Sequence, residues 1–104
     1  MADYILHPEV RRFLKSLTPE LKMRSSEQLI LLKTFGRQLS PPDSKKVSPE
    51  LFELRIVGAI QIRLMYGFVG DNIALVVSGF VKKSQKIPPR ELKLAHKRLR
   101  ELAE

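Results

Sequence analysis

The sequence has 104 residues, enough for one modest hydrophobic core but not for two, so we expect a single domain over residues 1–104. The composition is typical of a globular protein, and no run approaches the roughly 20 apolar residues that cross a bilayer, which excludes a membrane-spanning helix. The net charge is +8, and the absence of cysteine and of a basic-then-apolar leader excludes disulfides and a secretory signal, so we expect a cytoplasmic protein without membrane contact.

The first half of the chain predicts a short strand and two helices. Residues 2–6 suit a strand, and Pro8 suits the first turn of a helix. The apolar residues of that helix follow i, i+3, i+4, i+7 spacing: Val10, Phe13, Leu14 and Leu17. Thr18 caps a second helix, which we expect to run to about Phe35 before a glycine. Its apolar run over residues 29–32 is too wide for a narrow stripe and indicates burial on two sides or a partner contact.

The second half changes to a period of two, which predicts strands. After a proline-containing loop at residues 39–44, apolar residues alternate in three segments, residues 52–57, 60–69 and 73–80. We interpret these segments as an antiparallel meander with one apolar face. Two prolines at residues 88–89 open a last helix with a buried stripe of Leu92, Ala95, Leu99 and Leu102. The expected fold is therefore α+β, with an N-terminal helical hairpin, a mainly antiparallel twisted sheet of three to four strands, and a C-terminal helix.

Basic residues are concentrated in the second half. Residues 45–100 contain 12 basic and 4 acidic residues, whereas residues 1–44 contain 7 basic and 5 acidic ones. A basic patch attracts phosphate backbones through counterion release. The charge distribution alone does not decide between a surface that binds nucleic acid and a basic surface that is only solvated.

The strand pattern places two arginines together. If Leu54 and Leu64 face the core, then Arg55 and Arg63 face away from it, and a tight turn near residues 58–60 sets them opposite each other. Two like charges in direct opposition are destabilising unless an anion lies between them. This arrangement favours a phosphate-binding surface.

The next hairpin extends the outward face. With a turn near residues 70–72, Arg63 would lie opposite Ser78, and Phe80 and Lys82 would share its face. Guanidinium groups grip phosphate bidentately, and an aromatic ring stacks on an unpaired base. Structural roles also stay open: Arg55 could pair with Glu53, Phe80 could be core under the last helix, and the Lys82–Lys83 pair could protect a strand end.

Three segments resemble the HigB-like branch of the RelE/ParE toxin superfamily. They are LFELRI at residues 51–56, IRLMY at 62–66 and GFVKKSQKIP at 79–88. The resemblance covers nearly the whole chain, and the third segment is the most specific. The chain departs from the pattern of that branch in three places: Ile62 replaces an aromatic residue, Ser84 replaces threonine, and the pair Lys46-Val47 matches a Lys-Leu pair only approximately. No expected basic residue is missing.

The resemblance implies a compact RelE-like toxin of a type II toxin–antitoxin system that inhibits translation by cleaving mRNA, often on the ribosome. It also implies a cognate antitoxin, usually one with a helix-turn-helix, as the protein partner. Two alternatives remain: a ParE-like inhibitor of DNA gyrase, and an RNA-binding module without turnover.

Metal-independent RNA cleavage requires proton transfer at two oxygens, an in-line phosphate and stabilised charge. We expect four catalytic residues, Arg55, Arg63, Lys82 and Lys83. We expect five further residues to bind RNA: Lys46, Phe80, Gln85, Lys86 and His96. For His96 a half-buried structural role stays open. No acidic cluster or histidine pair suggests a metal site, and no glycine-rich loop suggests a nucleotide cofactor.

Overall fold

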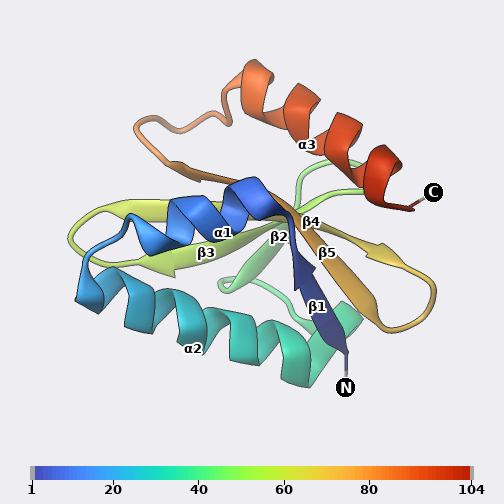
Figure 1. The fold of residues 1–104 in the computed structure, drawn as a ribbon, viewed down its shortest axis with the longest axis horizontal. Helices are drawn as coiled ribbons and strands as arrows, with labels where there is room; N and C mark the ends of the chain where they lie inside the picture. The colour runs from blue at the N-terminus through green and yellow to red at the C-terminus, as the bar shows by residue number, and fades with distance from the viewer. Residues whose placement is uncertain (1, 104) are drawn as a thin grey trace.

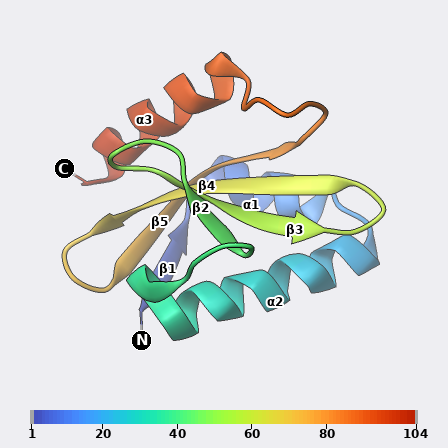
Figure 2. The ribbon, with the colours of Figure 1, turned by 180° about the vertical axis from the view of Figure 1, so that it is seen from behind.

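The computed structural model describes residues 2–103, which form a five-stranded mixed sheet between two layers of helices (Figure 1). The elements in chain order are β1 (Asp3–Leu6), α1 (Pro8–Lys15), α2 (Pro19–Phe35), η1 (Gly36–Gln38), β2 (Ser44–Lys46), β3 (Phe52–Val57), β4 (Gln61–Val69), β5 (Ile73–Val81) and α3 (Pro89–Ala103). Helices α1 and α2 cover one face of the sheet and α3 covers the other, as both views show (Figure 2). Within residues 2–103 no helix is long and apolar enough to cross a membrane.

The predicted α+β fold is confirmed, but the sheet is larger than predicted. Its strand order is β1-β5-β4-β3-β2. The meander β3–β4–β5 is the predicted one, and β1 joins it by parallel pairing with β5. Strand β2 lies partly in the segment predicted as a loop, and it pairs with β3 through Ser44 opposite Leu54. The side-chain hydroxyls of Ser44 and Tyr66 form a buried hydrogen bond, which anchors this short strand.

Local capping signals set the helix boundaries. The Thr18 hydroxyl accepts a hydrogen bond from the backbone N–H of Leu21 at 3.3 Å, and α2 ends at Gly36, whose φ is 54°. In α1 the cap is His7, whose Nδ1 accepts a hydrogen bond from the backbone N–H of Glu9 at 3.0 Å. Both helices therefore begin where the sequence predicts, and α2 also ends there.

The His7 cap predicts a pH-dependent stability. Burial lowers the pKa of His7 below its ordinary value of 6.5, Arg98 lowers it further, and two glutamates oppose the shift. The unfolded chain therefore binds more protons at this residue, and the free energy of unfolding should fall as the pH drops through 6.5. Urea unfolding at pH 7.5 and 5.5 measures this loss. His7→Asn keeps a capping oxygen but does not titrate, so it should show a smaller loss; an equal loss in both proteins would contradict the assignment.

The sheet has two buried faces, so the prediction of a single apolar face is wrong. Residues of α1, α2 and the sheet form the first core, which includes Leu29, Leu32, Leu54 and Leu64. The second core lies under α3 and contains Leu51, Met65, Leu75, Val77, Phe80, Ala95 and Leu99. Leu102 was predicted in the buried stripe of the last helix but is 39% exposed. The side chain of Ile30 is 59% exposed, so part of the apolar run in α2 faces outward.

A β-bulge in β5 brings Phe80 to the face that α3 covers. Tyr66 pairs with Val76 and Met65 pairs with Ser78, which leaves Val77 as the extra residue. The predicted pairing of Arg63 with Ser78 is therefore wrong, because Arg63 lies opposite Phe80. The prediction that Ser78 and Phe80 share the face of Arg63 is confirmed. Arg98 of α3 donates a hydrogen bond from Nη1 to the carbonyl of Val77 at 3.0 Å. Leu75 and Val77 face the second core by regular alternation, and the bulge places Ser78 and Phe80 on that face as well.

Close packing of α3 on β4 predicts a sensitive glycine. A Cβ on Gly67 would lie 2.7 Å from Cδ2 of Leu99 and 2.8 Å from the backbone oxygen of Glu50. We therefore expect Gly67→Ala to lower the free energy of unfolding by about 1–3 kcal/mol through overpacking. Gly70→Asn is the control, since Gly70 has φ 60° with open space around it and asparagine tolerates that conformation. Equal urea midpoints for the two variants would refute the expected clash.

Candidate active site

The two arginines lie opposite each other as predicted. Arg55 of β3 pairs with Arg63 of β4 in the antiparallel ladder. A glutamate on the same face holds both guanidinium groups: Oε1 of Glu53 is 3.3 Å from Nε of Arg55 and 3.7 Å from Nε of Arg63. The anion between the arginines is therefore Glu53, so their opposition does not by itself require a bound phosphate, and the alternative in which Arg55 pairs with Glu53 is confirmed. The three side chains together carry one net positive charge.

Burial separates the roles of the two arginines. The side chain of Arg55 is 31% exposed, whereas those of Arg63 and Glu53 are 8% and 2% exposed. The expectation that both guanidinium groups face water is therefore wrong for Arg63. Its Nη1 donates to the carbonyl of Ile62 at 3.0 Å and to the side-chain oxygen of Gln61 at 3.3 Å. Arg63 is therefore a buried positive charge beside Glu53, and Arg55 carries the positive charge that solvent can reach.

Electrostatics reinforce this division. Burial is the largest influence on Arg63 and lowers its pKa; Glu53 raises the pKa and Arg55 lowers it. A guanidinium nevertheless stays protonated in proteins, so Arg63 is a buried cation. Nε of Arg63 and Oε2 of Glu53 are buried without a hydrogen-bond partner among the described residues. The site therefore holds more hydrogen-bonding capacity than its own side chains use.

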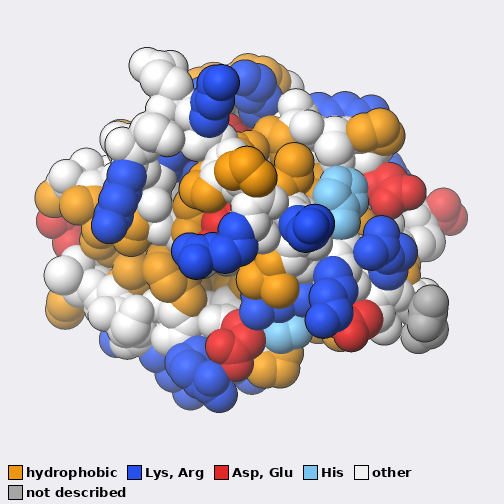
Figure 3. Space-filling view, turned by 90° about the horizontal axis from the view of Figure 1, so that it is seen from above, with side chains coloured by type: hydrophobic (Ala, Val, Ile, Leu, Met, Phe, Trp, Pro, Cys, Tyr) orange, Lys and Arg blue, Asp and Glu red, His pale blue; other side chains and the backbone are white. Residues whose placement is uncertain are grey.

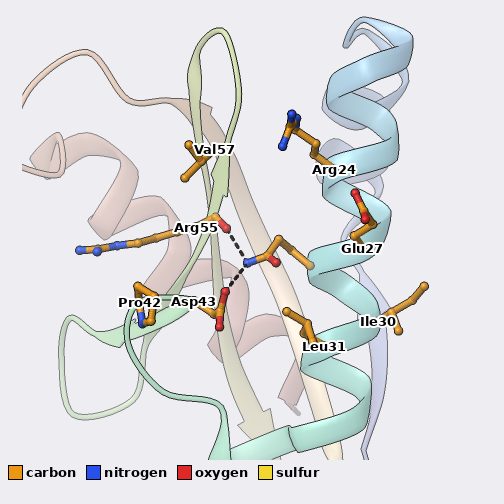
Figure 4. A pocket seen from close by; sticks show the side chains of 9 residues that line it. Arg24, Glu27, Ile30, Leu31, Pro42, Asp43, Arg55 and Val57 are labelled. Atoms are coloured by element: carbon orange, nitrogen blue, oxygen red, sulfur yellow. Dashed lines mark hydrogen bonds between the residues drawn. The ribbon is translucent and has the colours of Figure 1, made fainter.

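The backbone of Arg55 is fixed by α2 (Figure 4). Nε2 of Gln28 donates to the carbonyl of Arg55 at 2.7 Å and to Oδ1 of Asp43 at 3.3 Å. The backbone N–H of Arg55 donates to the carbonyl of Asp43 at 2.9 Å. Figure 4 shows the Arg55 side chain pointing away from α2. The helix thus holds the strand while leaving the guanidinium group directed to the opposite side.

The segment after β5 brings Lys82 to the same face. The backbone N–H of Lys82 donates to the carbonyl of Gln61 at 2.8 Å, which extends the ladder by one residue beyond Val81. Since alternate residues share a face, Lys82 follows Phe80 on the Arg63 side. Three predicted residues, Lys83, Gln85 and Lys86, are exposed in the connection to α3. Figure 3 shows Lys and Arg side chains distributed across the face of the molecule on the α3 side.

Within the described residues, no hydrogen bond or ion pair joins three other predicted residues, Phe80, His96 and Lys46, to the cluster of Arg55, Glu53 and Arg63. Phe80 is 7% exposed in the second core, so the structural alternative is confirmed and the ring is not free to stack on a base. His96 of α3 is half-buried, and its Nε2 lies 3.3 Å from Oγ of Ser48. Lys46 lies opposite Phe52, on the Leu54 face of the ladder. Phe80 therefore lies on the face of Arg63 as a core residue, whereas Lys46 lies on the other face.

Sequence reasoning missed Lys45. It pairs with Glu53 across the β2–β3 ladder and therefore shares the face of Arg55 and Arg63. Only the register of β2 reveals this neighbour, and a three-residue strand has too weak a pattern to predict that register. Within the described part of the chain, no three acidic or histidine side chains form a group that could hold a metal ion.

Residues 12–100 match the family described as "Phage derived protein Gp49-like (DUF891)". The chain belongs to this family. The match extends from α1 to the last turns of α3, so it includes every candidate residue of the Gp49-like site. A comparison with curated proteins gave no match.

Proposed function

We propose that this Gp49-like protein is the toxin of a type II toxin–antitoxin system and inhibits translation by cleaving mRNA on the ribosome. The observation that carries the proposal is the partly exposed guanidinium group of Arg55, held by buried Glu53 and backed by Arg63 on one face of the sheet. Lys45 and Lys82 flank it on that face. The family is known in toxin–antitoxin contexts, which supports the same assignment.

The proposed chemistry is an in-line attack within the RNA. The 2′-oxygen loses its proton and bonds to the adjacent phosphorus, the bond from phosphorus to the 5′-oxygen breaks, and that oxygen takes up a proton, which leaves a cyclic phosphate. Arg55 holds the non-bridging oxygens and stabilises the charge that develops on them. Lys82 and Lys83 supply further positive charge and a proton-transfer group. Arg63 and Glu53 keep Arg55 in place, and Gln85 and Lys86 contact the flanking backbone.

The proposal includes a cognate antitoxin as the protein partner, of the helix-turn-helix type. A groove of about 570 Å³ between α2 and β3 offers apolar surface for such a contact through Ile30, Leu31 and Val57. Ile30 and Val57 are more than half exposed, which is unusual for large apolar side chains on neighbouring elements. The backbone of Arg55 faces this groove, so a partner bound there would contact the strand that carries the site.

Mapping of transcript ends after a short pulse of expression tests the function. We expect new 5′ ends within coding regions for the wild type, and about 10²-fold fewer for the double variant Lys82→Ala, Lys83→Ala. Lys15→Ala with Lys22→Ala is the matched control, because both residues are exposed lysines of α1 and α2 on the other side of the sheet. Intact transcripts in all three strains would overturn the proposal. Intact transcripts with loss of plasmid supercoiling would instead indicate inhibition of gyrase.

A further inference from the structure

A basic hollow lies on the surface away from Arg55 and Arg63. Its volume is about 450 Å³, and β2, β3, β4, η1 and α3 all contribute to its walls. The residues that matter here are Arg37, Lys46, Glu50, Phe52, Phe68 and Arg100. The hollow thus combines three basic residues, one acidic residue and two aromatic rings. It also contains Lys46, the predicted RNA-binding residue that lies apart from Arg55.

The aromatic rings of the hollow pack against one another and against Arg37. Phe52 and Phe68 meet edge to face with their ring centroids 5.7 Å apart, and buried Tyr66 stacks on Phe52 at 5.4 Å. The guanidinium carbon of Arg37 lies 4.5 Å from the centroid of the Phe68 ring. Nη2 of Arg37 donates to the carbonyl of Gly70 at 2.9 Å, which holds the group in place. Guanidinium planes and aromatic rings are the surfaces on which unpaired RNA bases stack.

The charge of the hollow favours an anion beside the stacked group. Arg37, Lys46 and Arg100 are exposed, and within residues 2–103 none of them forms an ion pair. Glu50 is the acidic residue that lines the hollow, so the lining residues carry a net charge of +2. Uncompensated cations next to a stacking surface match a nucleotide, which has a planar base and a phosphate, better than an acidic peptide, which has no base to stack.

We infer that this hollow binds one nucleotide of a single-stranded RNA, at a position outside the step that is cleaved. Its base stacks on the surface formed by Arg37 and the phenylalanines, and its phosphate contacts Lys46 and Arg100. Phe52 is three residues from Arg55 along β3, about 10 Å at the usual rise of a strand, and faces the other side of the sheet. The hollow therefore serves a flanking nucleotide. The inference rests on the proposed function, because it assigns a further interaction to the same RNA substrate.

Binding of 2′-O-methyl RNA, which lacks the attacking hydroxyl, tests the inference without cleavage. Fluorescence anisotropy would compare a labelled trinucleotide with a labelled decanucleotide. We expect Arg37→Glu with Arg100→Glu to weaken decanucleotide binding at least tenfold and to lower the slope of log affinity against log salt by roughly 0.7 for each phosphate that the variant no longer neutralises. Trinucleotide binding at Arg55 should change much less. The control Lys15→Glu with Lys22→Glu makes the same change in net charge on the α1 and α2 side.

Two further variants test separately whether RNA binding at the hollow depends on ring stacking or on charge, and whether weaker binding results from misfolding. Phe68→Leu removes the ring without changing the charge and should also weaken decanucleotide binding. Lys46→Glu alters an exposed side chain and should do so without affecting the urea midpoint. Equal effects of the hollow and control variants, or binding of a decaglutamate peptide at the hollow in place of RNA, would overturn the inference. The proposed function would fail separately, through intact transcripts in the wild-type strain.

Discussion

Replacing Arg55 by alanine should lower the rate of the proposed RNA cleavage by about 10²–10³-fold, the range found when one preorganised donor to a developing oxyanion is removed. Arg55 is the accessible member of the arginine pair, and its Nε is already directed to Glu53, which leaves its terminal nitrogens for phosphate. Arg55→Lys should recover only part of the rate, because an ammonium group cannot reproduce the bidentate geometry. Single-turnover cleavage of mRNA on purified ribosomes is the measurement.

The matched control for this experiment is Arg24→Ala. Arg24 lies across the α2–β3 groove from Arg55 and is an exposed arginine that pairs with Glu20 one helical turn away. Its removal should leave the cleavage rate nearly unchanged, since it lies on the other side of β3 from the guanidinium group of Arg55. Wild-type cleavage by Arg55→Ala would show that the phosphate is held elsewhere. Urea unfolding of both variants would separate impaired chemistry from impaired folding.

Replacing Glu53 by alanine should lower the free energy of unfolding by about 3–5 kcal/mol, the largest stability effect that we expect from a single substitution at the site. The carboxylate is 2% exposed, and its removal would leave buried Arg63 directly opposite Arg55 with no anion between them. Glu53→Gln should also be strongly destabilising, because it keeps the shape but removes the charge. Urea unfolding at constant pH gives the values.

A double variant distinguishes disrupted charge balance from disrupted packing. Glu53→Leu with Arg63→Leu removes both buried charges and replaces them with apolar side chains, which in other buried pairs is close to neutral for stability. We expect this double variant to be more stable than Glu53→Leu alone, with a coupling energy of about 1–3 kcal/mol. If the losses of unfolding free energy for Glu53→Leu and Arg63→Leu simply added in the double variant, the two side chains would not balance each other's charge. A loss of unfolding free energy in Glu53→Ala that is much smaller than about 3–5 kcal/mol would also rule out this charge balance.

The elements with strong local signals could be predicted from the sequence. The cap at Thr18 and the glycine after Phe35 set the bounds of α2, because these residues satisfy the free backbone groups of a helix end whatever surrounds it. The opposition of Arg55 and Arg63 was also predictable, since a tight turn and side-chain parity determine the register of a hairpin. This local reasoning is the basis of the candidate site.

Features set by distant contacts could not be predicted. The bulge at Val77 lies where Arg98 of α3 bonds to β5, and nothing in the local alternation indicates an extra residue there. Burial of Arg63 likewise depends on what surrounds the β3–β4 hairpin in three dimensions. Parity places Glu53 beside the two arginines, but the choice between an internal carboxylate and a bound phosphate as their counterion requires the coordinates.

The parallel pairing of β1 with β5 has a consequence for synthesis of the protein. Asp3 lies beside Ile73, so β1 leaves the ribosome before its partner and cannot pair until some 70 further residues have followed it. Helices α1 and α2 reach the tunnel exit before the sheet that buries their apolar sides exists. The candidate site, whose residues lie on β3, β4 and the segment after β5, therefore assembles only after β5 has left the ribosome.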